Sequence, residues 1–190
     1  MQQGGLDEQH YEVLDDQGHK TGQLLDTAEV HKQGLWHETV NVWIMNPKGE
    51  VLLQLRAPNV ELAPGTWDVA VGTHVRPSED PANAALRCLQ SEVGITVTPN
   101  QLKHLFNIQS ATDMPNGTTH RVLGHVFLLK RDLQTQDLTY DQDKITELTW
   151  QPIEAVMAEV GGAESVKKYF PRPGDYFPQL FDALMAEQPL

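Results

Sequence analysis

The sequence lacks the features that mark several large classes of protein. Its single cysteine, Cys88, cannot form a disulfide within the chain. Its 14 basic residues are outnumbered by 26 acidic ones, and a net charge of −12 is unsuited to a surface that binds a nucleic-acid backbone. It has no apolar run of the roughly 18 to 20 residues that a membrane helix needs, and its first residues lack the basic start and apolar block of a signal peptide. We therefore expect a cytoplasmic protein that binds neither nucleic acid nor a membrane.

What the sequence does contain is a succession of strand, turn and helix patterns. Strands are predicted at residues 10–13, 38–45, 51–55, 102–112, 120–130 and 145–150. Helices are predicted at residues 80–93, 153–160 and 175–187. Turn residues are expected to join 38–45 to 51–55 as one hairpin and 102–112 to 120–130 as another, the second around Pro115-Asn116-Gly117. The alternation in 38–45 predicts a half-buried strand. This order favours an α+β fold with a mixed sheet flanked by helices, in one domain over residues 1–190.

The predicted helix at residues 80–93 has well-marked ends. Ser78 or Asp80 is expected to cap it, Pro81 suits its first turn, and Gly94 follows as its stop. The face expected to pack on the sheet consists of Ala82, Ala85, Leu86, Leu89 and Val93. The opposite face is expected to carry Arg87, Cys88, Ser91 and Glu92. On that face Glu92 is the one anionic side chain that a hard divalent ion could use as a ligand.

The same helix carries part of a recognisable motif. The matching positions are Glu79, Arg87, Leu89, Glu92, Gly94 and Ile95. In this spacing the chain resembles the Nudix hydrolases, whose motif is Gly, five residues, Glu, seven residues, then Arg-Glu-apolar-any-Glu-Glu-any-Gly-apolar. It departs from the motif at Thr73, Cys88 and Ser91, which stand where the motif has Gly, Glu and Glu. The resemblance implies a Nudix-type α/β/α sandwich with a central mixed sheet, the motif helix and C-terminal helices.

Residues outside the motif resemble the isopentenyl-diphosphate isomerase branch of that family, over about residues 10–155. The remainder, about residues 156–190, is expected to be helical and is not diagnostic. In the isomerase, a metal is bound by two N-terminal histidines, a histidine of the motif loop and carboxylates. The resemblance implies metal ligands here at His31, His37, His74 and Glu92. The isomerase also has a catalytic cysteine two residues before the loop histidine, and because this position is Gly72, isomerisation is not expected.

The resemblance also implies roles for other charged residues. Glu79, Arg87 and Glu92 are the candidate catalytic residues, and Glu79 and Arg87 are expected to form a brace between the loop and the helix. Arg56 stands where a diphosphate-binding arginine is expected, a role that suits the forked guanidinium group.

Two further positions have alternative interpretations. Lys144 stands where many family members carry a general-base Glu, which leaves Asp141 and Asp143 either as substitutes or as parts of a solvated loop. We expect Cys88 to fill a small space in the core or groove rather than to act as a nucleophile, because no histidine adjoins it in sequence.

Two functions are compatible with these residues. One is metal-assisted hydrolysis of a diphosphate linkage in a small molecule such as a nucleoside diphosphate derivative, weakened because Cys88 and Ser91 replace two carboxylates. The expected ion is Mg²⁺ or Mn²⁺. In a variant of this hypothesis, the histidines hold a transition-metal ion instead. The other function is a Nudix fold that lacks catalysis and binds a diphosphate compound or a protein. The sequence gives no indication of the oligomeric state.

Overall fold

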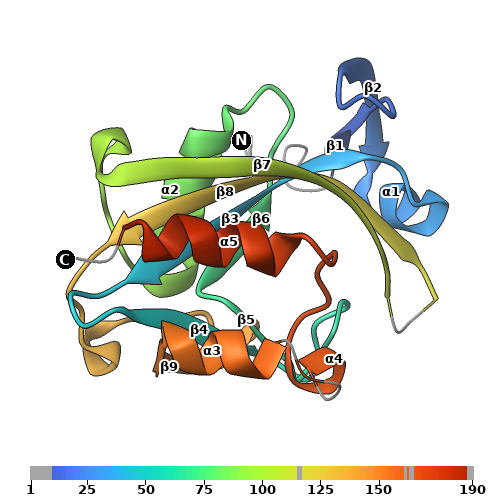
Figure 1. Cartoon of the computed structure of the whole chain (residues 1–190). Coiled ribbons are helices and arrows are strands. Elements are labelled where there is room, and N and C mark those ends of the chain that lie inside the picture. Colours follow the sequence, from blue (N-terminus) through green and yellow to red (C-terminus); the bar gives the residue numbers. More distant parts are fainter. Residues whose placement is uncertain (1–9, 115–116, 161, 163–164, 188–190) are drawn as a thin grey trace.

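The computed structural model describes residues 10–114, 117–160, 162 and 165–187, and a mixed sheet is its central element (Figure 1). The sheet has seven strands in the order β5-β4-β3-β8-β7, with β6 paired to β3 and β9 paired to β4. Its strands are β3 (His37–Met45), β4 (Glu50–Arg56), β5 (Trp67–Val69), β6 (Val71–His74), β7 (Leu102–Asp113), β8 (Thr119–Lys130) and β9 (Ile145–Pro152). Strands β3 and β8 run parallel, and the other pairs within the sheet are antiparallel.

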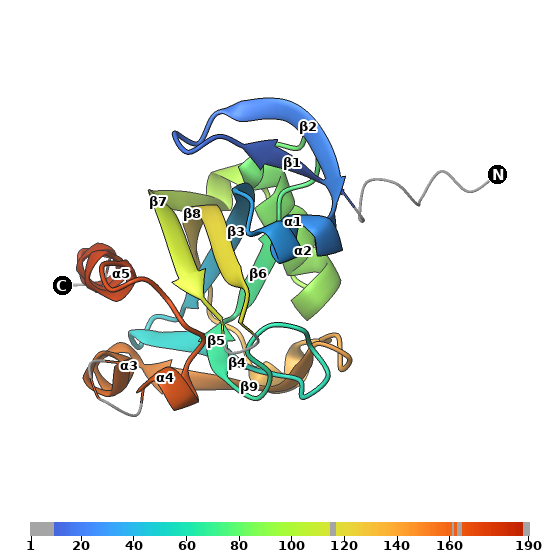
Figure 2. The same ribbon diagram turned by 90° about the vertical axis from the view of Figure 1, so that its right-hand side faces the viewer.

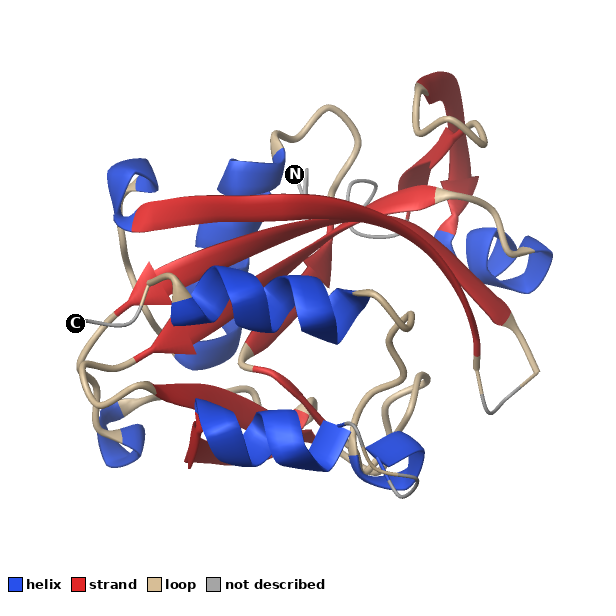
Figure 3. Cartoon of the chain, viewed as in Figure 1, coloured by secondary structure: helices blue, strands red, loops and turns tan. Residues whose placement is uncertain are grey.

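Helices lie on both sides of the sheet, which gives the expected sandwich (Figure 3). The described helices are α1 (Thr27–Gln33), α2 (Pro81–Val93), α3 (Ile153–Val160), α4 (Ser165–Lys168) and α5 (Tyr176–Met185), with short 3-10 turns η1 (Pro99–Gln101) and η2 (Thr135–Asp137). Helix α2 belongs to one core cluster and helices α3 and α5 to the other. Within the described residues, no helix combines the length and apolarity needed to cross a membrane.

A separate hairpin and helix α1 cover one end of the sheet (Figure 2). The hairpin consists of β1 (His10–Leu14) and β2 (Lys20–Asp26), which form a two-stranded sheet of their own. The sequence predicts β1 but neither β2 nor α1, because residues 20–26 are mostly exposed and show no apolar alternation.

The predicted strands and helices are all present, with ends that differ by one to two residues. The second predicted hairpin is present, and its register places Thr112 opposite His120. Its turn was predicted at Pro115-Asn116-Gly117, of which Pro115 and Asn116 lie outside the described residues.

The prediction of a β3–β4 hairpin is only partly right. The turn at Asn46 forms, and Asn46 Oδ1 accepts hydrogen bonds from the backbone nitrogens of Lys48 and Glu50. Beyond it the two strands pair only at Met45 and Val51. They diverge because β3 pairs along its length with β8 and β6, whereas β4 pairs with β9 and β5.

The prediction that residues 38–45 form a half-buried strand is wrong. Every residue of β3 except Glu38 is buried. The alternation of residue types remains visible, but helices cover both faces of the sheet, so the polar positions Thr39 and Asn41 are enclosed with the apolar ones. Burial of polar side chains on this strand is the first structural indication of a site.

Helix α2 has the expected ends but a rotated buried face. Asp80 caps it, with its Oδ1 accepting a hydrogen bond from the Ala82 nitrogen at 2.8 Å, and Gly94 ends it in the left-handed region at φ 71°. Its buried residues are Ala84, Ala85, Cys88, Leu89, Glu92 and Val93. Cys88 and Glu92 therefore belong to the buried side of the helix and do not lie opposite it, whereas Leu86, which was expected to pack on the sheet, is only partly buried.

Candidate metal centre and adjoining cavity

Strand register brings three histidines onto one face of the sheet. His37 and Thr39 lie two residues apart on β3 and so share a face. His74 of β6 is the antiparallel partner of Thr39, and Val122 of β8 is the parallel partner of His37. His120 comes two residues before Val122 on the same strand, and therefore faces the same side.

Helix α1 supplies a fourth histidine through a tight turn. The helix ends at Gly34, which has φ 60°. A Cβ atom at this position would lie 2.7 Å from the Arg121 Nη1 atom and 3.1 Å from the Thr119 carbonyl oxygen, so a larger residue would be strained at this positive φ. This close turn against β8 leads directly into β3 and places the ring of His31 5.3 Å, centroid to centroid, from that of His37.

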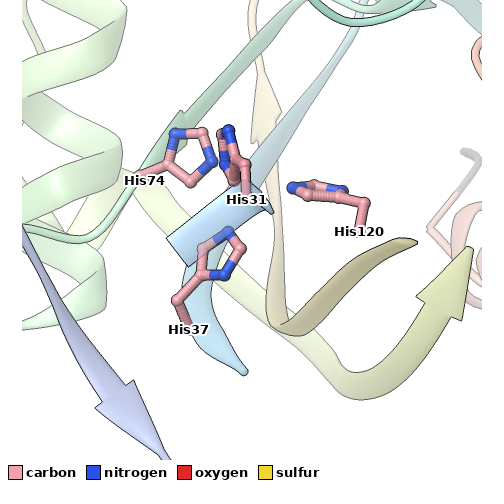
Figure 4. Close-up of side chains that lie close together, drawn as sticks. All are labelled: His31, His37, His74 and His120. Carbon is pink, nitrogen blue, oxygen red and sulfur yellow. The ribbon is translucent and has the colours of Figure 1, made fainter. Parts of the chain in front are cut away.

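The four histidines converge on a common centre. Each of His31, His37, His74 and His120 offers a ring nitrogen that lies within 4.8 Å of the corresponding nitrogens of the others. Figure 4 shows the four rings pointing toward one another from α1, β3, β6 and β8. This cluster, which we call the four-histidine cluster, joins four separate elements of the fold.

The ring nitrogens that face the centre have no hydrogen-bond partner. The buried nitrogens without a partner are both nitrogens of His31 and the Nε2 atoms of His37, His74 and His120, and each of the four residues offers one nitrogen to the centre. The nearest charged group to His31 is the Glu61 carboxylate, whose Oε2 is 3.8 Å from Nδ1, too far for a hydrogen bond. Buried polar atoms are normally paired, so unpaired nitrogens facing one another indicate that an absent group satisfies them.

Burial keeps the imidazoles neutral, the form that binds metal. Desolvation lowers the pKa of His37 to about 4 and that of His120 to about 3. Desolvation also lowers the pKa of His74 well below its usual value, and it lowers that of His31 against the opposing effect of Glu61. Nδ1 of His37 lies 3.0 Å from the Leu35 carbonyl oxygen, and a hydrogen bond donated there leaves the Nε2 lone pair free to bind an ion.

Tyr11 of β1 covers one side of the four-histidine cluster. Its ring stacks on His74 at 4.4 Å and on His37 at 5.3 Å, measured between centroids. The β1–β2 hairpin therefore contributes a wall of the centre. Neither Tyr11 nor His120 is identified by the sequence analysis, because no local pattern distinguishes them, and only strand pairing and the placement of the hairpin bring them to the other rings.

The donor set fits a transition-metal ion better than Mg²⁺. Imidazole nitrogen suits Zn²⁺, Cu²⁺, Fe²⁺ and Ni²⁺, whereas Mg²⁺ requires oxygen ligands in a near-octahedral array. His31, His37 and His74 are brought together as the resemblance implies, and His120 joins them. Glu92, the remaining expected ligand, lies outside this group.

Glu92 is instead paired with a cation from the chain itself. Its Oε1 atom is 3.4 Å from Nζ of Lys144, which precedes β9. Desolvation raises the pKa of this buried carboxyl group, and the Lys144 charge opposes that effect. Cys88 is almost fully buried in the core. Burial is the main cause that raises the pKa of its thiol, and the charge of Glu92 adds to this effect. Cys88 is therefore a core residue, as expected, and not an activated nucleophile.

The expected brace between Glu79 and Arg87 is present. The Arg87 guanidinium donates to both Glu79 oxygens, each at 2.8 Å, and also to the His74 carbonyl oxygen at 3.1 Å. The Glu79 carboxylate in turn accepts from the Arg76 backbone nitrogen at 2.9 Å. The brace thus fixes helix α2 to the loop that follows β6, and it holds the backbone of one member of the four-histidine cluster.

Arg56 lines a cavity that adjoins the four-histidine cluster. The cavity has a volume of about 130 Å³, and His74 and His120 form part of its wall. Arg56 donates from Nε to the Leu62 carbonyl oxygen at 3.0 Å, and its Nη1 is 3.4 Å from Oδ2 of Asp68. Gly72 also lines this cavity and brings no thiol to it.

Comparison with known proteins agrees with this architecture. A family model described as NUDIX domain matches residues 35–172. The isopentenyl-diphosphate Delta-isomerase of Escherichia coli is 30% identical over 149 residues, which cover 78% of this chain and 80% of that protein. Nudix hydrolase 3 of Arabidopsis thaliana is 33% identical over 100 residues, which cover 52% of this chain and only 13% of that protein.

A solved structure shows the same fold. A protein from Deinococcus radiodurans superposes with a TM-score of 0.67 at 19% identity, and the match covers 92% of this chain and 98% of that chain. Because the family model matches well over half of the sequence, including the motif helix and three of the four histidines, the chain belongs to the Nudix family.

Proposed function

We propose that this chain is a Nudix-type hydrolase that cleaves a diphosphate linkage in a small molecule and that its metal ion is held by the four-histidine cluster. The observation that carries the proposal is the set of buried imidazole nitrogens that face one another without partners. Desolvating that many polar atoms is costly unless a ligand compensates for it, and a divalent transition-metal ion is the ligand that neutral imidazoles bind best.

When bound, such an ion would polarise a phosphoryl oxygen and lower the pKa of a coordinated water. The chain's own part is to hold four neutral rings in place, to exclude solvent with Tyr11, and to present Arg56 to the substrate from the cavity wall. The brace between Glu79 and Arg87 has a positioning role, because it fixes the backbone of His74 and does not line the cavity.

The motif helix lacks two of the carboxylates that the Nudix motif has, and this supports the four-histidine cluster as the metal site. Cys88 and Ser91 replace two carboxylates, and Lys144 places an ammonium group beside the remaining Glu92. A cation fixed at this distance from the carboxylate competes with Mg²⁺ for it. Isomerase chemistry is not favoured, because Gly72 stands at the position of the catalytic cysteine and the cavity wall offers no other thiol among the described residues.

A second candidate function is binding without catalysis. A tetrahedral zinc site with four protein ligands is closed, whereas a catalytic site keeps a position open for water or substrate. If all four rings bind at once, the ion would be structural and the cavity would serve only to hold a ligand. Turnover would therefore require either that one ring leaves the ion or that the ion accepts the substrate at a fifth coordination position.

The test begins with metal analysis of protein purified without a histidine tag. We expect about one transition-metal ion per chain in the wild type and in His19→Ala, and a loss of most of it in His74→Ala and His120→Ala. His19 is the matched control because its side chain is 72% exposed and lies outside the four-histidine cluster. A wild type that holds no metal, even after incubation with Zn²⁺, Mn²⁺ and Fe²⁺, would show that the cluster is not a metal site.

The second step is an assay of diphosphate cleavage in a panel of nucleoside diphosphate compounds, measured as release of the nucleoside monophosphate. Turnover should require the transition metal, persist when Mg²⁺ is omitted, and vanish in His74→Ala. Metal binding with no turnover across the panel would rule out the hydrolase proposal and favour the second candidate function.

A further inference from the structure

The cavity beside the four-histidine cluster has one positive charge more than negative ones. Among the described residues that line it, full charges are carried by Arg56, Arg172 and Asp68. Both guanidinium groups contact the same carboxylate: Arg56 Nη1 approaches Oδ2 of Asp68 at 3.4 Å, and Arg172 Nη2 donates to Oδ1. These three side chains leave one cationic charge unbalanced at the cavity wall.

Arg172 reaches this cavity from the part of the chain at about residues 156–190, whose sequence is not diagnostic of a function. After α4, Tyr169 pairs with Trp67 of β5, and the Phe170 nitrogen donates to the Trp67 carbonyl oxygen at 2.8 Å. This short extension of the sheet places residue 172 over Asp68, the neighbour of Trp67 on β5. This segment therefore places Arg172 at the Asp68 carboxylate, which Arg56 of β4 also contacts.

Two aromatic rings hold the Arg172 side chain in place. Its Cζ atom lies 4.7 Å from the centroid of the Phe170 ring and 4.9 Å from that of Tyr176. The Arg56 Cζ atom lies 5.0 Å from the same Phe170 ring. Rings placed over guanidinium planes restrict their motion without using their N–H groups, so both arginines are preorganised donors.

The arginine positions leave hydrogen-bonding capacity for a ligand. A guanidinium has five N–H donors, and the hydrogen bonds that the structure gives Arg172 and Arg56 go to Asp68 and Leu62. Apart from His74 and His120, the remaining polar side chains of the wall are uncharged, namely Thr39, Asn41, Thr73, Ser110 and Thr112. The cavity volume of about 130 Å³ is about four times the share of liquid volume of one water molecule, and drug-sized ligands need roughly 300 Å³ or more.

We propose that Arg172 is a substrate-binding residue and that, with Arg56, it binds one phosphoryl group of the substrate in this cavity, next to the four-histidine cluster. The proposal rests on the proposed function, and it specifies that a phosphoryl group is the part of the substrate that the cavity binds. A forked guanidinium matches the oxygens of a phosphoryl group, and the size of the cavity leaves the rest of the substrate outside. Arg172 therefore selects for a terminal phosphoryl group and not for a particular nucleoside or alkyl portion.

The test measures binding of inorganic phosphate and pyrophosphate by calorimetry, with the metal-loaded and the chelator-treated full chain in parallel. Arg172→Gln should weaken phosphate binding by roughly tenfold or more in both forms, because it removes a charge-assisted donor pair. Arg131→Gln is the matched control, since Arg131 follows β8 and does not line the cavity. Acetate serves as the planar comparison anion and should bind more weakly than phosphate.

A second variant keeps the test informative if Arg172→Gln fails to fold. Asp68→Asn keeps an Oδ1 acceptor for the Val69 nitrogen and for Arg172 but removes the carboxylate charge. If the arginines bind an oxyanion, this variant should tighten phosphate binding by roughly fivefold or more, because the cavity then carries two uncompensated charges. A purely structural Arg172 would give no such gain.

The outcomes separate this proposal from the proposed function. Metal-loaded protein whose phosphate binding is unchanged in Arg172→Gln and in Asp68→Asn, or which binds acetate as tightly as phosphate, would overturn the role of Arg172 and leave the metal centre intact. Phosphate binding that depends on Arg172 in a protein that takes up no metal would support the anion site and overturn the proposed metal chemistry.

Discussion

Glu79 and Arg87 show how one ion pair serves both the motif and the site. The Arg87 guanidinium contacts both Glu79 oxygens and the carbonyl oxygen of His74. Burial tends to raise the pKa of Glu79, but hydrogen bonds from Arg87 and from the Arg76 backbone outweigh it, so the pKa lies below its usual value. Both side chains are partly exposed, so solvent screens the attraction.

The pair predicts a pH-dependent contribution to stability. A carboxyl group whose pKa is lowered by folding stabilises the protein above its unfolded pKa, and this contribution is lost as the pH falls through its folded pKa. We expect Glu79→Gln to lower the free energy of unfolding by about 1 to 2 kcal/mol at pH 7, with the difference from wild type shrinking below pH 4.

Urea unfolding at several pH values measures this difference. Glu147→Gln, which alters an exposed carboxylate on β9, serves as the control and should have little effect. A Glu79→Gln difference that stays constant or grows under acidic conditions would contradict the assigned role of the pair.

At the scale of elements, helix α2 combines well-defined ends with a buried carboxylate that is paired inside the chain. Its cap at Asp80, its stop at Gly94 and its apolar contacts with the sheet are all in place. Its inward side holds Cys88 against the core, and Lys144 lies against Glu92 from the segment before β9. Through Arg87 the helix therefore holds the backbone of His74, and its buried carboxylate Glu92 contacts Lys144.

The contact between Glu92 and Lys144 predicts how a Mg²⁺ site could be introduced on this helix. In Ser91→Glu combined with Lys144→Ala, a second carboxylate is added at an exposed position beside Glu92 and the competing ammonium group is removed. We expect millimolar Mg²⁺ to raise the melting temperature of this double variant by about 2 to 4 °C and to leave that of the wild type unchanged.

The single variant Lys144→Ala separates the two changes, because it removes the ammonium group without adding a ligand. It should show a smaller Mg²⁺ response than the double variant. Equal responses to Mg²⁺ in the wild type and the double variant would show that Lys144 does not keep the ion away.

At the scale of the whole molecule, helix α5 ties the end of the described chain to the centre of the sheet. The Trp43 indole nitrogen on β3 donates to the Tyr176 hydroxyl at 3.0 Å, and both residues are buried. Tyr176 also lies beside Arg172 and lines the cavity. Packing of α5 therefore connects the stability of the sheet to the shape of the candidate site.

Removing this hydroxyl should destabilise the whole fold. We expect Tyr176→Phe to lower the free energy of unfolding by about 1 to 3 kcal/mol, because it leaves the buried Trp43 N–H without an acceptor. Tyr169→Phe is the matched control: its hydroxyl bonds to Glu159, which also contacts Lys168 and is well exposed, so less should be lost. Chemical unfolding of the two variants measures the difference, and equal losses would argue against a special role for the buried bond.

The sequence alone was sufficient for the elements and for part of the site. Apolar alternation, turn residues and helix caps are local, so they predicted the main strands and the helix 80–93, and the family resemblance implied the brace between Glu79 and Arg87. The resemblance to the isomerase branch also implied three of the four clustered histidines. It placed Glu92 with them, whereas the fold pairs that carboxylate with Lys144.

Tertiary structure decided which residues share a site. His120 joins His37 because β3 and β8 pair in parallel with a fixed register, and Arg172 reaches Asp68 because Tyr169 extends the sheet beside β5. Both contacts link residues far apart in the chain, and side-chain type says nothing about such pairing. The sequence by itself thus determined the family, the scaffold and the loss of the motif carboxylates. The fold determined the four-histidine cluster and the arginine-lined cavity, because strand register and helix packing, which are not local properties, bring these side chains together.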